Sequence, residues 1–145
     1  MAHNVRAVIF NQKGQFLVVS EVDDSDNFKL PGGKFENDES AQEAIKRELE
    51  EELNLSSEYY NLELAAELKT EDEGDKRYIF SVKLNVGVNV DPNLDEIAKF
   101  LWVNEASVPE GKNKNHILSA VASCSEQSWS PYIVIAFLCS NTLSS

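Results

Sequence analysis

Three glutamates in the segment 33–55 have the side-chain type and the spacing to hold a metal ion. Glu48, Glu51 and Glu52 stand at positions i, i+3 and i+4, so on a helix they share one face within about one turn. Like charges that close repel and raise one another's pKa values. A helix keeps such a cluster most readily where a hard divalent cation neutralises it. The spacing therefore predicts a site for Mg²⁺, with Mn²⁺ as the alternative ion, whereas the glutamates taken alone also fit a solvated helix face.

The residues around this cluster extend the pattern. Gly33 is followed after five residues by Glu39, and after seven more by Arg47 and Glu48. Together with Leu49, Glu51, Glu52 and Leu55, they make the segment resemble the Nudix box, G-x5-E-x7-R-E-U-x-E-E-x-G-U, in which U is apolar. Eight of the nine specified positions match. The ninth is Asn54 in place of glycine, and asparagine tolerates the left-handed conformation that often follows a helix.

The resemblance implies a reaction and a set of metal ligands. A Nudix enzyme hydrolyses a phosphoanhydride bond by attack of water at phosphorus, and metal ions neutralise the polyphosphate and acidify water. The ligands that the resemblance implies are the carboxylates of Glu48, Glu51 and Glu52 and the backbone carbonyl of Gly32.

The resemblance also implies a further carboxylate from a loop beyond the box. In MutT-like members a glutamate six residues before a tryptophan, at the start of a late strand, lies near the metals. Here Glu96 precedes Trp102 by six residues. Glu96 is therefore expected to be a ligand or the general base. Asp95 is the alternative ligand, and Glu51 is the alternative base.

Arg47 is expected to support the site rather than to react. A guanidinium makes charge-assisted contacts that orient a carboxylate, and Glu36 and Glu43 are the candidate partners. Since Glu43 lies four residues before Arg47, a simple surface pair on the helix is the alternative. Glu39 is expected to support the start of the helix rather than to bind metal.

The residues that would bind the organic part of the substrate are less sharply indicated. Phe28 and Leu30, just before Pro31, are placed to line a pocket or to join the core. Asn113 resembles the base-reading asparagine of MutT-like enzymes, and an Asn side chain can both donate to and accept from a nucleobase edge; loop capping is its alternative role. His116 has no partner in the sequence that suggests a function.

Size and composition set limits on the protein class. The chain has 145 residues, 42% of them hydrophobic, and a net charge of −12, which predicts a single globular domain over residues 1–145. The acidity argues against binding to nucleic acid or to an anionic membrane, both of which need a basic surface. The sequence has no apolar run long enough to span a bilayer and no signal-peptide pattern. Cys124 and Cys139 suggest reduced thiols, so a cytoplasmic location is expected.

Periodicity predicts a mixture of strands and helices. Strands are expected at 4–10 and 15–20 around a hairpin turn at 11–14, then at 62–68, 78–86 and 100–103, with a short extended piece at 28–30. A helix should run from about residue 39 or 40 to 53 with Asp38 as its N-cap, and a second helix should cover 114–123. The acidic tract 71–75 should be a loop, and the apolar run 132–139 fits either a strand or a helix. The resemblance implies an α/β/α sandwich with a mixed β-sheet between helices.

These observations support one principal hypothesis. The chain is expected to be a Mg²⁺-dependent pyrophosphohydrolase that cleaves a nucleoside diphosphate linked to a group X, with a nucleoside triphosphate, oxidised forms included, as the leading substrate and a nucleoside monophosphate as product. The first alternative is a non-catalytic Nudix domain that senses a nucleotide or nucleotide sugar. The second is an acidic interaction module without a pocket. Oligomeric state is not predicted, and a homodimer through the run 132–139 stays open.

Overall fold

The computed structural model of the chain describes residues 3–71 and 74–127, with side chains as far as residue 124. The apolar run 132–139 lies outside these residues. The description therefore covers the whole of the segment 33–55 and the strands and helices expected around it. Among the described residues, no helix is both long and apolar enough to cross a membrane.

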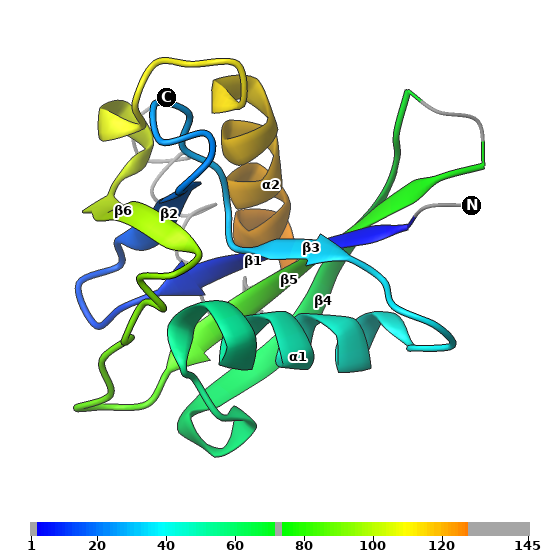
Figure 1. Cartoon of the computed structure of the whole chain (residues 1–145), viewed down its shortest axis with the longest axis horizontal. Helices are drawn as coiled ribbons and strands as arrows, with labels where there is room; N and C mark the ends of the chain where they lie inside the picture. Colours follow the sequence, from blue (N-terminus) through cyan, green and yellow to red (C-terminus); the bar gives the residue numbers. More distant parts are fainter. Residues whose placement is uncertain (1–2, 72–73, 128–145) are drawn as a thin grey trace, which may run out of the picture.

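Six strands form one mixed sheet (Figure 1). They are β1 (Asn4–Phe10), β2 (Phe16–Glu21), β3 (Gly32–Lys34), β4 (Tyr60–Lys69), β5 (Lys76–Leu84) and β6 (Ile97–Val103). Their order is β4-β5-β1-β2-β6, and β3 pairs with β1 beside this path. Strands β1 and β5 are parallel, while the other pairs are antiparallel. The five predicted strands are thus confirmed, and the extended piece at 28–30 contributes only an isolated bridge between Val19 and Lys29.

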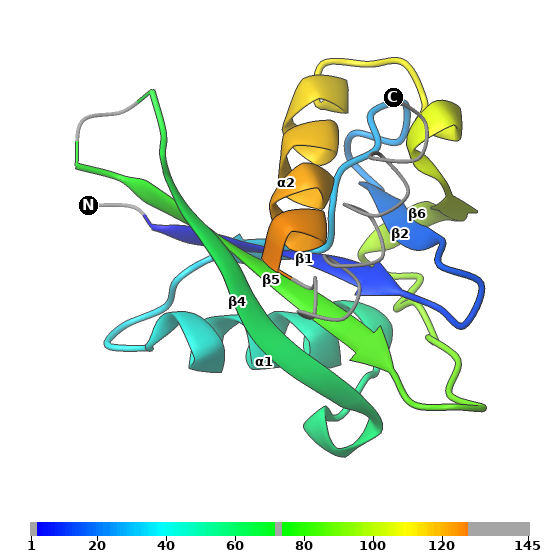
Figure 2. The same ribbon diagram turned by 180° about the vertical axis from the view of Figure 1, so that it is seen from behind.

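Two helices cover the two faces of the sheet. Helix α1 (Ala41–Leu53) packs against β1 and β3, and α2 (Lys114–Gln127) packs against β4, β5 and β1. Figures 1 and 2 show the sheet between them, with α1 below and α2 above. Short 3₁₀ turns occur at Ser57–Tyr59 and Glu105–Ser107. The expected sandwich of a mixed sheet between helices is confirmed.

Helix α1 begins and ends for identifiable local reasons. Its N-cap is Ser40, which corrects the prediction of Asp38: the Ser40 hydroxyl accepts from the Glu43 N–H, and the Glu43 carboxylate accepts from the Ser40 N–H. This reciprocal pair needs a glutamate three residues after the cap, which Asp38 does not have. The helix ends at Leu53 as predicted, and Asn54 adopts the left-handed conformation with φ 51°.

The core lies on both sides of the sheet, because alternate residues of each strand point to opposite faces. On the α1 side, Ile45, Leu49 and Leu53 of the helix are fully buried and pack in one cluster with Val5, Ala7, Ile9 and their neighbours. On the α2 side, Val8 packs with residues of α2. Arg6 is two residues from Val8 on the same strand, so it faces α2 as well.

Candidate active site

Helix α1 presents the three glutamates at three different depths. Glu52 is buried, with 4% of its surface exposed. The side chain of Glu48 is 14% exposed and that of Glu51 is 50% exposed. The cause is their angular position on the helix: Glu52 and Glu48 flank the buried stripe, whereas Glu51 is turned toward solvent. The cluster is therefore not a solvated helix face.

Glu52 is held in an environment that disfavours its charge. Its Oε1 accepts a hydrogen bond from the Gly32 N–H at 2.9 Å, while its Oε2 is buried with no partner among the described residues. The pKa of Glu52 is raised from 4.5 to about 8, chiefly by burial and also by the nearby Glu48 carboxylate. The Gly32 N–H and the Arg6 charge act in the opposite direction. Without a cation, this carboxyl group is therefore protonated at neutral pH.

Two adjacent glycines let strand β3 approach its neighbours closely. Gly32 has φ +145°, and a Cβ there would lie 2.0 Å from the carbonyl oxygen of Val5. A Cβ on Gly33 would lie 2.5 Å from Oε1 of Glu48. A side chain at Gly32 would collide with backbone, whereas one at Gly33 would have to displace the flexible end of Glu48. The first glycine thus permits pairing of β3 with β1, and the second leaves room for the Glu48 carboxylate.

Arg47 ties four carboxylates together. Its Nε donates to Glu39 at 2.6 Å, and one terminal nitrogen donates to Glu48 at 3.0 Å and to Glu51 at 3.2 Å. Glu36 lies 3.5 Å from the Nε, as one sequence alternative expected. The Glu39 contact is the main cause that raises the pKa of Arg47, and in return it lowers the pKa of Glu39.

The other expected partner of Arg47, Glu43, caps the helix instead. This corrects both the Glu43 contact and the simple surface pair. The distinction matters because the contacts of Arg47 to Glu39 and Glu48 bridge the loop before α1 to the face of the helix that carries Glu48, Glu51 and Glu52. Arg47 also donates to the carbonyl of Lys34 at 3.1 Å, so it joins that loop to β3 as well.

A loop between β5 and β6 brings Glu96 to the same cleft. The loop is fastened to the end of α1, where Asn93 donates through its backbone to the Glu52 carbonyl at 2.7 Å and through its side chain to the Glu51 carbonyl at 3.2 Å. Burial raises the pKa of Glu96, and the Glu51 and Glu48 charges raise it further. Asp95 lines the cleft beside it.

The cleft has a volume of about 350 Å³ and is lined mainly by acidic side chains and by the two glycines of β3. The predicted residues Gly32, Arg47, Glu48, Glu51, Glu52 and Glu96 all line it. Two further acids, Glu21 and Asp23, also line it, and the sequence did not single them out. Their position follows from pairing of β2 with β6, in which Glu21 lies opposite Ile97, and no local motif marks them.

The residues of the cleft fit a divalent cation by their chemistry. A buried carboxylate oxygen without a partner, on Glu52, lies beside the Glu48 carboxylate, and carboxylate oxygens are what Mg²⁺ and Mn²⁺ prefer. Within the described residues, no three His, Cys, Asp or Glu side chains are already gathered as a metal cluster. Arg47 donates to both Glu48 and Glu51 in this arrangement.

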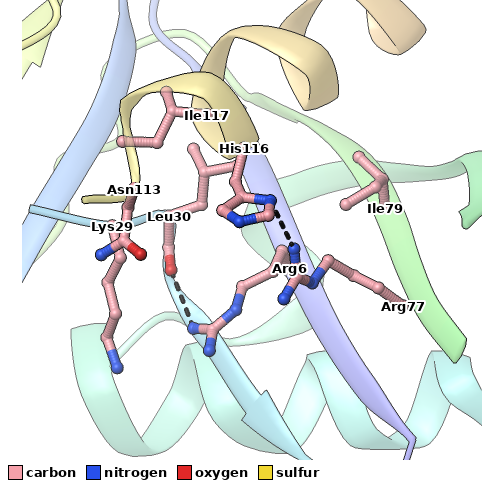
Figure 3. A pocket seen from close by; sticks show the side chains of 8 residues that line it. All are labelled: Arg6, Lys29, Leu30, Arg77, Ile79, Asn113, His116 and Ile117. Carbon is pink, nitrogen blue, oxygen red and sulfur yellow. Dashed lines mark hydrogen bonds between the residues drawn. The ribbon is translucent and has the colours of Figure 1, made fainter. Parts of the chain in front are cut away.

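A second, smaller cavity lies on the α2 side of the sheet (Figure 3). It has a volume of about 70 Å³, and its lining residues are Arg6, Lys29, Leu30, Arg77, Ile79, Asn113, His116 and Ile117. Leu30 and Asn113 were predicted to bind substrate, and both line it. Phe28 is not in this lining; it packs against the core on the α2 side. Asn113 donates to the Phe28 carbonyl at 3.1 Å, which is the loop-holding role considered as its alternative.

The sequence missed the basic residues of this cavity. Arg77 donates to Oδ1 of Asn4 at 3.0 Å and lies 3.2 Å from the His116 ring nitrogen, and Arg6 donates to the Leu30 carbonyl at 3.0 Å. Arg6 and Arg77 lie on strands far apart in the chain, and only their parallel pairing brings them together. The available signal was an arginine, Arg6, inside the otherwise mostly apolar predicted strand 4–10.

The sequence and the fold were compared with known protein families and solved structures, and both comparisons point to the same family. The model of the NUDIX domain matches residues 2–121, whereas no curated protein matches by sequence. Among solved structures, an ADP-ribose pyrophosphatase from Streptococcus suis is 23% identical with a TM-score of 0.67, over 90% of this chain and 93% of that chain. A MutT protein from Methanosarcina mazei is 23% identical with a TM-score of 0.62, over 88% and 95%. An Ap4A hydrolase from C. elegans is 18% identical with a TM-score of 0.70, over 87% and 96%.

Proposed function

The chain belongs to the Nudix family and is a hydrolase of phosphoanhydride bonds, and on that premise we propose that it cleaves a nucleoside diphosphate linked to a group X with the help of Mg²⁺. The products are a nucleoside monophosphate and phosphorylated X. A nucleoside triphosphate, oxidised forms included, is the leading substrate, and Mn²⁺ is the alternative ion. Two proteins of similar structure are named as an ADP-ribose pyrophosphatase and an Ap4A hydrolase. Their names support a nucleotide derivative as the substrate and leave the group X to be identified.

The observation that carries this proposal is the buried Glu52 carboxyl beside Glu48. A carboxyl group with an unpartnered buried oxygen and a pKa raised to about 8 lowers the stability of the folded protein as the pH rises above its ordinary pKa of 4.5, unless a cation binds there. Glu48 and Glu52 would hold the ion, with Glu51 and the Gly32 carbonyl completing the set. When bound, a divalent ion neutralises the polyphosphate and acidifies water.

Glu96 is proposed as the general base. Its pKa is raised by burial and by neighbouring carboxylates, and a base works best when its pKa is near the working pH. Glu51, half exposed and on the same cleft, is the alternative base. Arg47 is a positioning residue, because its contacts orient Glu48 and Glu51 through their carboxylates. Leu30 and Asn113 would contact the organic part of the substrate from the second cavity.

A hydrolysis panel tests the proposal. The protein is incubated with Mg²⁺ and nucleoside triphosphates, dinucleotides or nucleotide sugars, and the nucleoside monophosphate is quantified. We expect turnover of at least one compound, its loss on chelation, and a decrease in kcat of about 10²–10⁴-fold for Glu52→Gln and Glu96→Gln. Glu50→Gln, on the exposed side of α1, is the matched control and should retain activity.

The panel also separates the alternatives. If no compound turns over while a nucleotide binds, the sensor function replaces the proposed one. If Glu52→Gln turns over as fast as the unaltered protein, the assignment of the site is wrong. If Glu51→Gln loses activity and Glu96→Gln does not, the base is Glu51.

A further inference from the structure

Two arginines in the small cavity lack an acidic partner. The chain carries 25 acidic against 13 basic residues, so acidic partners are abundant, and Arg47 alone contacts four of them. Within the described part of the chain, however, neither Arg6 nor Arg77 forms an ion pair with a carboxylate; their hydrogen bonds go to the Leu30 carbonyl, the Asn4 amide oxygen and the His116 ring. The third cation of the lining, Lys29, is paired with Glu21.

The two guanidinium groups repel each other across the cavity. Burial is the main cause that lowers the pKa of Arg6; the charge of Glu52 in the neighbouring cleft raises it, and the charge of Arg77 lowers it. Figure 3 shows Arg77 beside the His116 ring and the Arg6 guanidinium turned toward Leu30, with all three side chains in the cavity lining. A guanidinium has five N–H donors in a planar fork that suits phosphate or carboxylate oxygens. Neither guanidinium has a carboxylate hydrogen-bond partner among the described residues, so the two together suit an oxyanion.

The size and position of the cavity restrict that oxyanion. A volume of about 70 Å³ holds a few water molecules, far less than the 300 Å³ or more of a pocket for a whole drug-sized ligand. It therefore suits a compact group such as a phosphate. The cavity lies near the acidic cleft, since Leu30 of its lining is two residues from Gly32 of the cleft and the Glu52 charge of the cleft acts on Arg6. A single substrate molecule can thus occupy both the acidic cleft and the small cavity.

We propose that the cavity between β1, β5 and the first turn of α2 binds a phosphate group through Arg6 and Arg77, separate from the phosphates that are hydrolysed. The phosphate comes either from the substrate, as a second phosphate on its organic part, or from free orthophosphate. The first source rests on the proposed function; the second does not. The substrate class that follows is a nucleoside diphosphate derivative with an additional phosphomonoester.

Titration with orthophosphate tests the site independently of catalysis. Metal is removed with a chelating resin, and phosphate binding is measured by calorimetry. We expect saturable binding in the millimolar range and a loss of affinity of about tenfold or more in Arg77→Gln, because a charge-assisted contact disappears. Arg6→Met, which keeps an apolar stem in the cavity, should lose a similar factor.

The control is Lys83→Gln, which removes an exposed positive charge from the same strand β5 and should leave the affinity unchanged. Circular dichroism checks that each variant is folded. If Arg77→Gln does not fold, the phosphate affinity of Arg6→Met decides whether the site exists. Absence of saturable binding, or equal affinity in the arginine variants and the control, would overturn the proposal.

Kinetics with paired compounds identify the source of the phosphate. NADP⁺ and NAD⁺ share one pyrophosphate linkage and differ by one phosphate, as do coenzyme A and dephospho-coenzyme A. A phosphate on the substrate predicts kcat/KM at least about tenfold higher for the phosphorylated member, and Arg77→Gln should remove this preference by slowing that member alone. Equal kcat/KM within both pairs, together with phosphate binding, assigns the site to free orthophosphate. If neither pair turns over, these compounds fail as substrates of the proposed function, while the titration still decides the site.

Discussion

Replacement of Glu52 by glutamine should stabilise the metal-free protein while removing its response to metal. In the folded protein the pKa of Glu52 is raised from 4.5 to about 8, so its carboxyl stays protonated where the unfolded chain has lost the proton. Stability is therefore complete below about pH 4.5 and falls as the pH rises toward about 8. At about 1.4 kcal/mol per pKa unit, the loss is about 1 kcal/mol at about pH 5 and about 3 kcal/mol at about pH 7.

Glutamine mimics the protonated carboxyl and escapes this loss. Its amide oxygen can accept the Gly32 N–H as Oε1 of Glu52 does, and its amide nitrogen can donate to Glu48. The variant should therefore exceed the unaltered protein in free energy of unfolding by about 3 kcal/mol at about pH 7, and by about 1 kcal/mol at about pH 5. Mg²⁺ should raise the stability of the unaltered protein by mass action and leave the variant unchanged.

The assay is urea unfolding followed by circular dichroism, with chelator or Mg²⁺, at both pH values. Glu50→Gln is the matched control, since Glu50 is exposed on the same helix and its replacement should change stability by no more than about 0.5 kcal/mol. A Glu52→Gln variant less stable than the unaltered protein at neutral pH in chelator would refute the account of a buried, charge-disfavouring carboxyl. So would a gain that is the same at both pH values.

Three further outcomes are expected. Gly33→Ala should reduce kcat by about tenfold or more while stability falls by no more than about 1 kcal/mol, because its Cβ displaces the flexible end of Glu48 and misplaced ligands slow catalysis; unchanged kcat would contradict this. Arg47→Lys should reduce kcat about tenfold with KM nearly unchanged, since the ammonium lacks the fork that holds several carboxylates, and steady-state kinetics measure the split. In a Cys139→Ser background, Cys124 should alkylate slowly with iodoacetamide until urea is added, because burial raises the pKa of its thiol to about 11; fast labelling of the native protein would disprove its burial.

Local patterns carried much of the fold. Alternating apolar residues located β4 and β5, and runs of β-forming residues located β1, β2 and β6. Apolar residues at every fourth position, Ala41, Ile45, Leu49 and Leu53, located α1, because each pattern depends on neighbours within a few positions. The left-handed Asn54 was also predictable, since a helix end selects residues that tolerate positive φ. The predicted N-cap, Asp38, is wrong, although the Ser40 and Glu43 pair that caps the helix is recognisable in the sequence by its spacing.

The candidate site divides in the same way. The spacing of Glu48, Glu51 and Glu52 gave their common helix face, but their depths of burial depend on what packs against α1. Arg47 was expected to contact Glu36 or Glu43, yet its shortest contact is with Glu39. The reason is that the loop before α1 turns back along the helix. That path is not encoded in residue spacing.

The sequence by itself determined the phosphate chemistry, because the box places its glycine, arginine and glutamates on one short segment whose geometry is local. The tertiary structure alone decided which residues from other parts of the chain surround the box. Pairing of β1 with β5, over seventy residues apart in the chain, sets Arg6 and Arg77 together above the sheet, and packing of the β5–β6 loop on α1 delivers Glu96 to the cleft. Such contacts join distant residues, so they arise from burial and strand pairing rather than from any periodicity.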